Sequence, residues 1–117
     1  MPNKVNLRHK RKWQVWRTDV HFKQDPNQSK KRPFLISEIH RGYVYGHEMT
    51  SKKWQYDKNP DHFYEVKNKK KAGLTDHSYV NFDKTVASKL SMKEYMGSLD
   101  PKDIRSFNAK KKRYYKK

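Results

Sequence analysis

The apolar residues of this chain occur in short runs separated by polar turns, a pattern that limits the chain to a fold built mostly of strands. The most continuous run covers residues 34–39 and predicts a central strand, with Pro33 as its first residue. Over residues 13–22 the apolar side chains change parity near Arg17, which predicts a first strand with a bulge at that point. Arg41-Gly42 predicts a hairpin turn, and residues 62–67 and 78–82 predict two further strands. A polar loop is expected over residues 51–61.

One helix is expected, near the end of the sequence. Asp100 is a good N-cap, Pro101 suits the first turn, and Asp103 favours the positive end of a helix. Ile104 and Phe107 then fall on one face, so the helix should be short. Five or six short strands and a short C-terminal helix predict a mostly β protein, a small antiparallel β-barrel.

The positive charge is concentrated at the two ends of the sequence. The chain has 29 Lys and Arg against 12 Asp and Glu, a formal net charge of +17. Residues 1–12 carry five cations and residues 109–117 carry six, both without an acid, which leaves +6 for residues 13–108. We therefore expect a basic N-terminal extension (1–12), a folded domain (13–108) and a basic C-terminal tail (109–117). Such charge predicts a polyanionic partner, and the alternative is that the ends are only solvated.

Several classes of site are excluded or disfavoured. The absence of cysteine excludes disulfides, thiolate zinc sites and cysteine nucleophiles. The six histidines show no metal-ligand spacing, and the four glycines form no phosphate-binding loop, so no metal or cofactor is expected. No apolar run approaches the length of a membrane span, and we expect a cytoplasmic protein with no membrane partner.

Aromatic residues interleaved with cations point toward RNA. Single-stranded RNA binds proteins by stacking its bases on exposed rings while cations follow its phosphates. Trp54, in a polar segment beside Lys52 and Lys53, is the best stacking candidate. Tyr43, Tyr45, Phe63 and Tyr64 are better explained as core residues of a small barrel.

Four segments in order resemble the MazF/PemK-type toxins, the endoribonucleases of type II toxin–antitoxin systems with the CcdB/PemK-like fold. They are KRPFLI at 31–36, MTS at 49–51, AGLTDHSYV at 72–80, and MGSL at 96–99 followed by the expected helix. The order and spacing agree over residues 13–107.

The resemblance implies an SH3-like barrel that forms a homodimer. It also implies an acidic antitoxin partner and metal-independent, sequence-specific cleavage of single-stranded mRNA, leaving a 2′,3′-cyclic phosphate and a 5′-hydroxyl. Arg32 matches the family's catalytic arginine, Thr50 its catalytic or phosphate-contacting threonine, and Asp76 its aspartate. No arginine accompanies Asp76 as it does in some relatives, and His77 stands beside it, so either of the two is a candidate general base.

The remaining candidates are RNA-binding residues: Lys31, Ser51, Lys52, Lys53 and Trp54. The alternative interpretation of Arg32 is a solvated cation before a strand, and that of Thr50 with Ser51 is a turn. The alternative function is a non-catalytic basic RNA-binding module of the same fold, ribosome-associated or regulatory.

Overall fold

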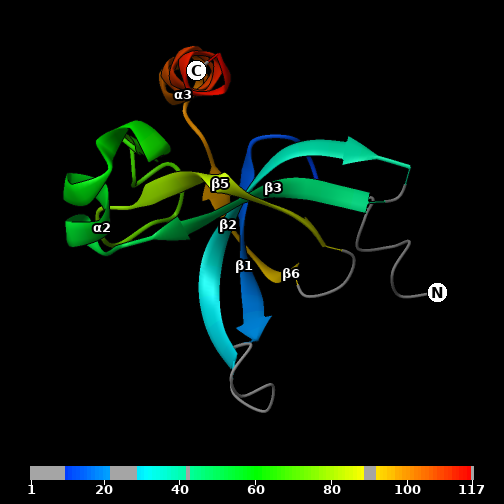
Figure 1. Ribbon diagram of the computed structural model, residues 1–117. Helices are drawn as coiled ribbons and strands as arrows, with labels where there is room; N and C mark the ends of the chain where they lie inside the picture. The colour runs from blue at the N-terminus through cyan, green and yellow to red at the C-terminus, as the bar shows by residue number, and fades with distance from the viewer. Residues whose placement is uncertain (1–9, 22–28, 42, 89–91, 117) are drawn as a thin grey trace.

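The computed structural model describes residues 10–21, 29–41, 43–88 and 92–116 (Figure 1). Its six strands form one antiparallel sheet with the order β4-β5-β3-β2-β1-β6. The strands are β1 (Gln14–His21), β2 (Ser29–His40), β3 (Tyr43–Thr50), β4 (Phe63–Glu65), β5 (Tyr79–Ser88) and β6 (Met92–Ser98). The helices are α2 (Lys53–Lys58), the 3₁₀ turn η1 (Pro60–His62) and α3 (Pro101–Tyr115).

The mostly β, antiparallel class is confirmed, with one difference in how the sheet ends. Strands β4 and β6 are the two edges of the sheet, and within the described ranges no strand pairing closes it into a barrel. The bulge predicted in the first strand near Arg17 is not found in β1, because the pairing of β1 with β2 is regular from Val15 to His21. The β1–β6 register does shift between Arg17 and Thr18, but the extra residue there belongs to β6. The sheet is strongly twisted (Figure 1), and its core contains Val15, Leu35 and Val80.

Strand β2 is central, as predicted, but it begins at Ser29 and not at Pro33. Pro33 lies opposite Arg17 on β1, and the pairing of β2 with β3 begins only at Phe34. Proline, which has no N–H to donate, is therefore placed just before the second ladder begins. The antiparallel pairing on either side of the predicted hairpin turn is confirmed, since His40 pairs with Tyr43, and Gly42 lies outside the described residues.

The segment predicted as a polar loop contains two short helical elements, α2 and η1. An ion pair between Lys53 and Asp57, 3.0 Å long and one helical turn apart, supports α2. The strand predicted at 78–82 continues to Ser88, because it pairs with β3 along much of its length.

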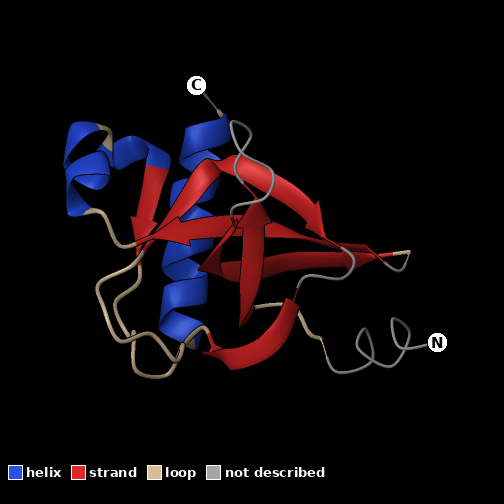
Figure 2. Ribbon diagram, turned by 90° about the horizontal axis from the view of Figure 1, so that it is seen from below, coloured by secondary structure: helices blue, strands red, loops and turns tan. Residues whose placement is uncertain are grey.

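The C-terminal helix begins at the predicted cap, where the Asp100 carboxylate accepts a hydrogen bond of 2.8 Å from the Lys102 N–H. It then continues for 15 residues across the division expected after residue 108. The additional turns are held by Tyr114, whose ring stacks on Phe82, and by Tyr115, whose hydroxyl donates to the Phe82 carbonyl. Figure 2 shows α3 running across the strands on one side of the sheet. In the part of the chain described, no helix is both long and apolar enough to cross a bilayer.

Candidate active site

A pocket of about 220 Å³ opens where β2 begins and β3 ends, at the end of this hairpin away from its turn. Its walls come from β1, β2, β6, the end of β3 with the residues after it, and the loop before β5. The lining residues that carry charges or hydroxyl groups are Arg17, Arg32, Thr50, Ser51, Lys52, Thr75, Asp76 and Ser78.

Arg32 and Thr50 both line this pocket. Phe34 and Glu48 form the first pair of the β2–β3 ladder, and Arg32 and Thr50 each lie two residues beyond that pair on their strands. The Thr50 Oγ1 accepts a hydrogen bond of 3.1 Å from the Lys52 backbone N–H. Since this contact uses a lone pair, the hydroxyl proton stays available for an acceptor in the pocket. The predicted pair of an arginine and a threonine is therefore one local constellation.

Asp76 reaches the pocket from a loop that is tightly held. Gly73 has φ +74°, and a Cβ at this position would collide with the Met96 carbonyl oxygen, so only glycine fits. Leu74 is buried in the core beside it. On the other side of Asp76, the Ser78 hydroxyl donates to the Asp76 carbonyl with a distance of 3.1 Å. The backbone of Asp76 is thus held in place, and its exposed side chain lines the pocket.

Arg17 is a pocket residue that the sequence did not single out. It lines the pocket from β1, and its Nη1 lies 3.8 Å from Glu94 Oε2 on β6. Both side chains are about half exposed, at 41% and 58%, so solvent screens this ion pair strongly. The sequence shows a change of parity of the apolar residues at Arg17. That Arg17 lies near Arg32, however, depends on the pairing of β1 with β2.

Of the predicted RNA-binding residues, Ser51 and Lys52 line the pocket. Lys31 lies on β2 opposite Asp19, and its side chain is outside the described part of the chain. The pocket thus carries the cations Arg17, Arg32 and Lys52.

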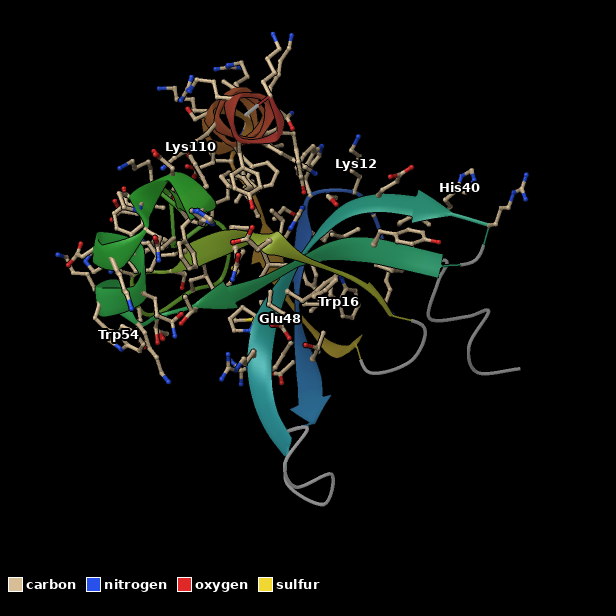
Figure 3. All side chains as sticks on the ribbon, in the orientation of Figure 1. Lys12, Trp16, His40, Glu48, Trp54 and Lys110 are labelled. Carbon is tan, nitrogen blue, oxygen red and sulfur yellow. The ribbon has the colours of Figure 1, made fainter. Side chains whose placement is uncertain are left out.

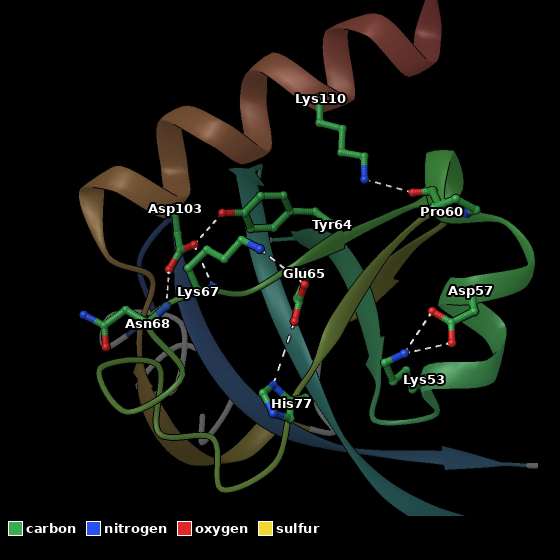
Figure 4. Close-up of polar contacts among 10 residues, drawn as sticks. All are labelled: Lys53, Asp57, Pro60, Tyr64, Glu65, Lys67, Asn68, His77, Asp103 and Lys110. Atoms are coloured by element: carbon green, nitrogen blue, oxygen red, sulfur yellow. Dashed lines mark hydrogen bonds and ion pairs between the residues drawn. The ribbon is translucent and has the colours of Figure 1, made fainter.

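Three predicted residues do not line the pocket. His77 points outward and lies 3.8 Å from Glu65 (Figure 4), with 70% of its side chain exposed. Lys53 is paired with Asp57 within α2. Trp54 is 62% exposed on α2 (Figure 3), where its ring is accessible.

The combination of groups in the pocket suits an anionic ligand. Guanidinium groups give planar, permanently charged contacts to phosphate, hydroxyls add neutral donors, and a carboxylate can accept a proton. Among the described residues, no group of three or more His, Asp or Glu side chains could hold a metal ion.

No family model matches this sequence, and no curated protein matches it significantly. Among solved structures, the chain is similar to an endoribonuclease in complex with its cognate antitoxin from a mycobacterial species. The TM-score is 0.65, and the alignment covers 91% of this chain and 92% of the other at 19% identity. A second mycobacterial endoribonuclease is similar with the same TM-score and identity, over 91% and 90% of the two chains. At this identity the likeness shows a shared fold.

Proposed function

We propose that this protein is a MazF/PemK-type toxin, a sequence-specific endoribonuclease that cleaves single-stranded mRNA without a metal ion. The observation that carries the proposal is the shared pocket of Arg32, Thr50 and Asp76, three residues from separate segments of the sequence. The likeness to two endoribonucleases over nine-tenths of the chain supports the same reading at the level of the fold.

In the proposed reaction, the ribose 2′-oxygen attacks the adjacent phosphorus, and the bond from phosphorus to the 5′-oxygen breaks. The products are a 2′,3′-cyclic phosphate and a 5′-hydroxyl. Negative charge grows on the non-bridging oxygens, and Arg32 with the Thr50 hydroxyl would stabilise it. Arg17 would add a second guanidinium to the phosphate, because its weak pair with Glu94 is easily exchanged.

Asp76 is the favoured general base for the 2′-hydroxyl proton, because it lines the pocket and His77 does not. His77 faces Glu65 instead. A direct comparison of Asp76→Asn with His77→Asn separates the two. Asp76→Asn is expected to lower the cleavage rate. A lower rate only in His77→Asn would assign the role of general base to His77.

The proposal includes an acidic antitoxin, a homodimer and a cytoplasmic location. The net charge of +17 would attract an acidic protein segment. The structure neighbour in complex with its cognate antitoxin supports this partner class. Sedimentation of the protein alone, and with the product of an adjacent gene for a small acidic protein, measures both associations.

The test is cleavage of end-labelled single-stranded RNA in EDTA. Arg32→Ala is expected to lower the rate about 10²–10³-fold, as for other lost transition-state donors. Thr50→Ala should also lose activity, and Thr50→Ser, which keeps the hydroxyl, should retain most of it. Wild-type products should carry 5′-hydroxyl ends.

Arg41→Gln is the matched control, since Arg41 is an exposed arginine at the other end of the β2–β3 hairpin. It removes the same charge from the molecule and is expected to leave the cleavage rate unchanged. Equal losses in Arg32→Ala and Arg41→Gln would show that only net charge matters and would contradict the assigned site.

The second candidate function is a non-catalytic RNA-binding module. The observation in its favour is that Asp76 is the one carboxylate among the described residues lining the pocket, and no histidine joins it there. A proton donor for the leaving 5′-oxygen is therefore not evident. Salt-sensitive RNA binding with no cleavage by the wild type would establish this function instead.

A further inference from the structure

The outer face of α3 carries a line of cations. The exposed cations of α3 and its C-cap are Lys102, Arg105, Lys112, Arg113 and Lys116, here called the α3 stripe. Positions 102, 105, 109, 112 and 116 follow one another at intervals of three or four residues, so they share a single helix face. Ala109 fills the middle position with a small side chain, and Arg113 lies beside the line. From residue 102 to residue 116 the stripe extends about 21 Å.

The stripe lies on the opposite side of the helix from the groups that dock it. Phe107 and Asp103 are buried against the sheet. Along the same inner side, Lys110 Nζ donates to the Pro60 carbonyl at 2.9 Å, and Lys111 Nζ lies 3.3 Å from His47 Nε2. Figure 3 shows other nitrogen-tipped side chains of α3 on the side of the helix that faces away from the sheet. The stripe is therefore displayed on a fixed helix, which lowers the entropic cost of binding through it.

The acids of α3 do not neutralise this surface. Asp103 is buried, and both of its oxygens accept hydrogen bonds from within the protein. Asp100 is occupied at the cap, where it binds the Lys102 N–H and the Asn68 side-chain amide. Within the part of the chain that the structure describes, Lys102, Arg105, Lys112 and Lys116 form no ion pair, whereas Arg113 lines a small hollow together with Asp61. The charge of these four cations is available to a partner.

We propose that the α3 stripe is a second RNA-binding surface, separate from the pocket, that contacts the phosphates of a single strand. Lys102 with Arg105, and Lys112 with Lys116, are neighbours about 5–6 Å apart on the helix face, a spacing that lets each pair serve consecutive phosphates of an extended strand. The two pairs are about 10 Å apart because Ala109 lies between them. The choice of RNA over another polyanion rests on the proposed function.

An acidic protein is the less suitable partner for this surface. Protein interfaces depend on a few large anchors such as Trp, Tyr and Leu that enter pockets. Between the cations of the stripe lie Ala109 and Ser106, which offer no such anchor. A surface of cations alone instead suits the sequence-independent, salt-dependent contacts of a phosphate backbone.

The test compares two triple variants with the same net charge. Arg105→Gln, Lys112→Gln and Lys116→Gln together remove three stripe cations, and glutamine keeps the helix because its helix propensity is high. The control combines substitutions at three exposed cations elsewhere: Arg41→Gln, Lys58→Gln and Lys70→Gln. Circular dichroism checks that both variants keep their helix content.

Binding is measured by fluorescence anisotropy with a 2′-O-methyl RNA of about 30 nucleotides at salt concentrations from about 50 to about 200 mM. This probe lacks the attacking 2′-hydroxyl, so binding is measured whether or not the protein cleaves RNA. The stripe variant is expected to bind about tenfold more weakly and to lower the slope of log K against log [salt] by about 2. The control should bind like the wild type.

Equal weakening of both triple variants would overturn the proposal, because the effect would then follow net charge alone. Unchanged RNA binding by the stripe variant, with weaker binding of poly-glutamate, would overturn it in favour of an acidic protein partner. Failure of the proposed function has a different signature, in which the wild type binds the RNA through the stripe but cleaves no natural RNA.

Discussion

The substitution Asp103→Asn tests how α3 is held on the sheet. Asp103 is 2% exposed, and its Oδ1 accepts hydrogen bonds from the Tyr64 hydroxyl and from the Lys67 N–H at 2.9 Å. Its Oδ2 accepts a third hydrogen bond from the Asn68 N–H, also at 2.9 Å (Figure 4). Burial, together with the hydrogen bond to Asp103, raises the pKa of the Tyr64 hydroxyl, so this group stays a donor. The carboxylate thus joins helix, strand and loop through three donors.

Asparagine has nearly the same shape but only one acceptor oxygen. If that oxygen keeps the two hydrogen bonds of Oδ1, the side-chain NH₂ of the new asparagine takes the place of Oδ2. It then faces the Asn68 backbone N–H, and two hydrogen-bond donors lie opposite each other. The substitution loses a hydrogen bond to a charged acceptor and leaves a buried donor without its partner. These two effects together cost about 3 kcal/mol. With a urea m-value of about 2 kcal/mol per M, the unfolding midpoint should fall by about 1.5 M.

Urea unfolding followed by tryptophan fluorescence and by helix ellipticity measures this change. The rings of Trp13 and Phe107 form a T-shaped pair with 5.8 Å between their centroids, so the fluorescence of Trp13 reports the docking of α3. The comparison variant is Asp100→Asn, which keeps a helix cap and loses only the contribution of the carboxylate charge, so its midpoint should fall less than that of Asp103→Asn. A urea midpoint for Asp103→Asn within about 0.25 M of the wild type would refute the role of Asp103 in holding α3, since the loss of unfolding free energy would then be at most about 0.5 kcal/mol.

Three further changes have definite expected outcomes. The hydrogen bond from the Lys102 N–H lowers the pKa of the Asp100 carboxyl in the folded state. The stability that the carboxylate adds is therefore present above the unfolded pKa of about 3.9 and is lost as the pH falls through the folded pKa. In Asp100→Asn, the fall of the thermal midpoint at acid pH should become less steep. Gly97→Ala should destabilise the fold by about 1–3 kcal/mol in thermal unfolding, because the new Cβ would collide with the Lys71 carbonyl, and wild-type stability would contradict this. Arg17→Gln should lower kcat/KM for RNA about tenfold through the loss of a charged phosphate contact, whereas Glu94→Gln, which only frees Arg17, should not lower it.

The parts of the fold and site that could be predicted depend on local sequence. Arg32, Thr50 and Asp76 were singled out because each lies in a short segment that resembles a segment of the MazF/PemK-type toxins, and all three line one pocket. In the segment that carries Asp76, glycine is required at position 73 for a physical reason. Gly73 has a φ of +74° and lies so close to the backbone of β6 that no side chain fits there. The cap at Asp100 was predictable for the same reason, because capping needs only neighbouring residues.

What the sequence did not reveal depends on contacts between distant segments. Arg17 joins the site only through the pairing of β1 with β2 and β6. Asp103 looked like an acid that favours the helix dipole, but the Tyr64 hydroxyl and the loop after β4 make it a buried clamp. The length of α3 was underestimated because residues 109–115 look like a basic tail, while Tyr114 anchors them on Phe82.

Residues 67–78 connect the two surfaces proposed to bind RNA. Asp103 holds the start of this segment to α3, Gly73 and Leu74 fix its middle, and the end carries Asp76 into the pocket. Loss of the clamp in Asp103→Asn should therefore loosen a pocket wall and lower kcat even for short RNA. Loss of the stripe acts on binding outside the pocket, so its effect should appear in KM and grow with RNA length. Cleavage kinetics on short and long RNA distinguish these two effects, and a loss of kcat from stripe substitutions would show that the helix face and the pocket are one site.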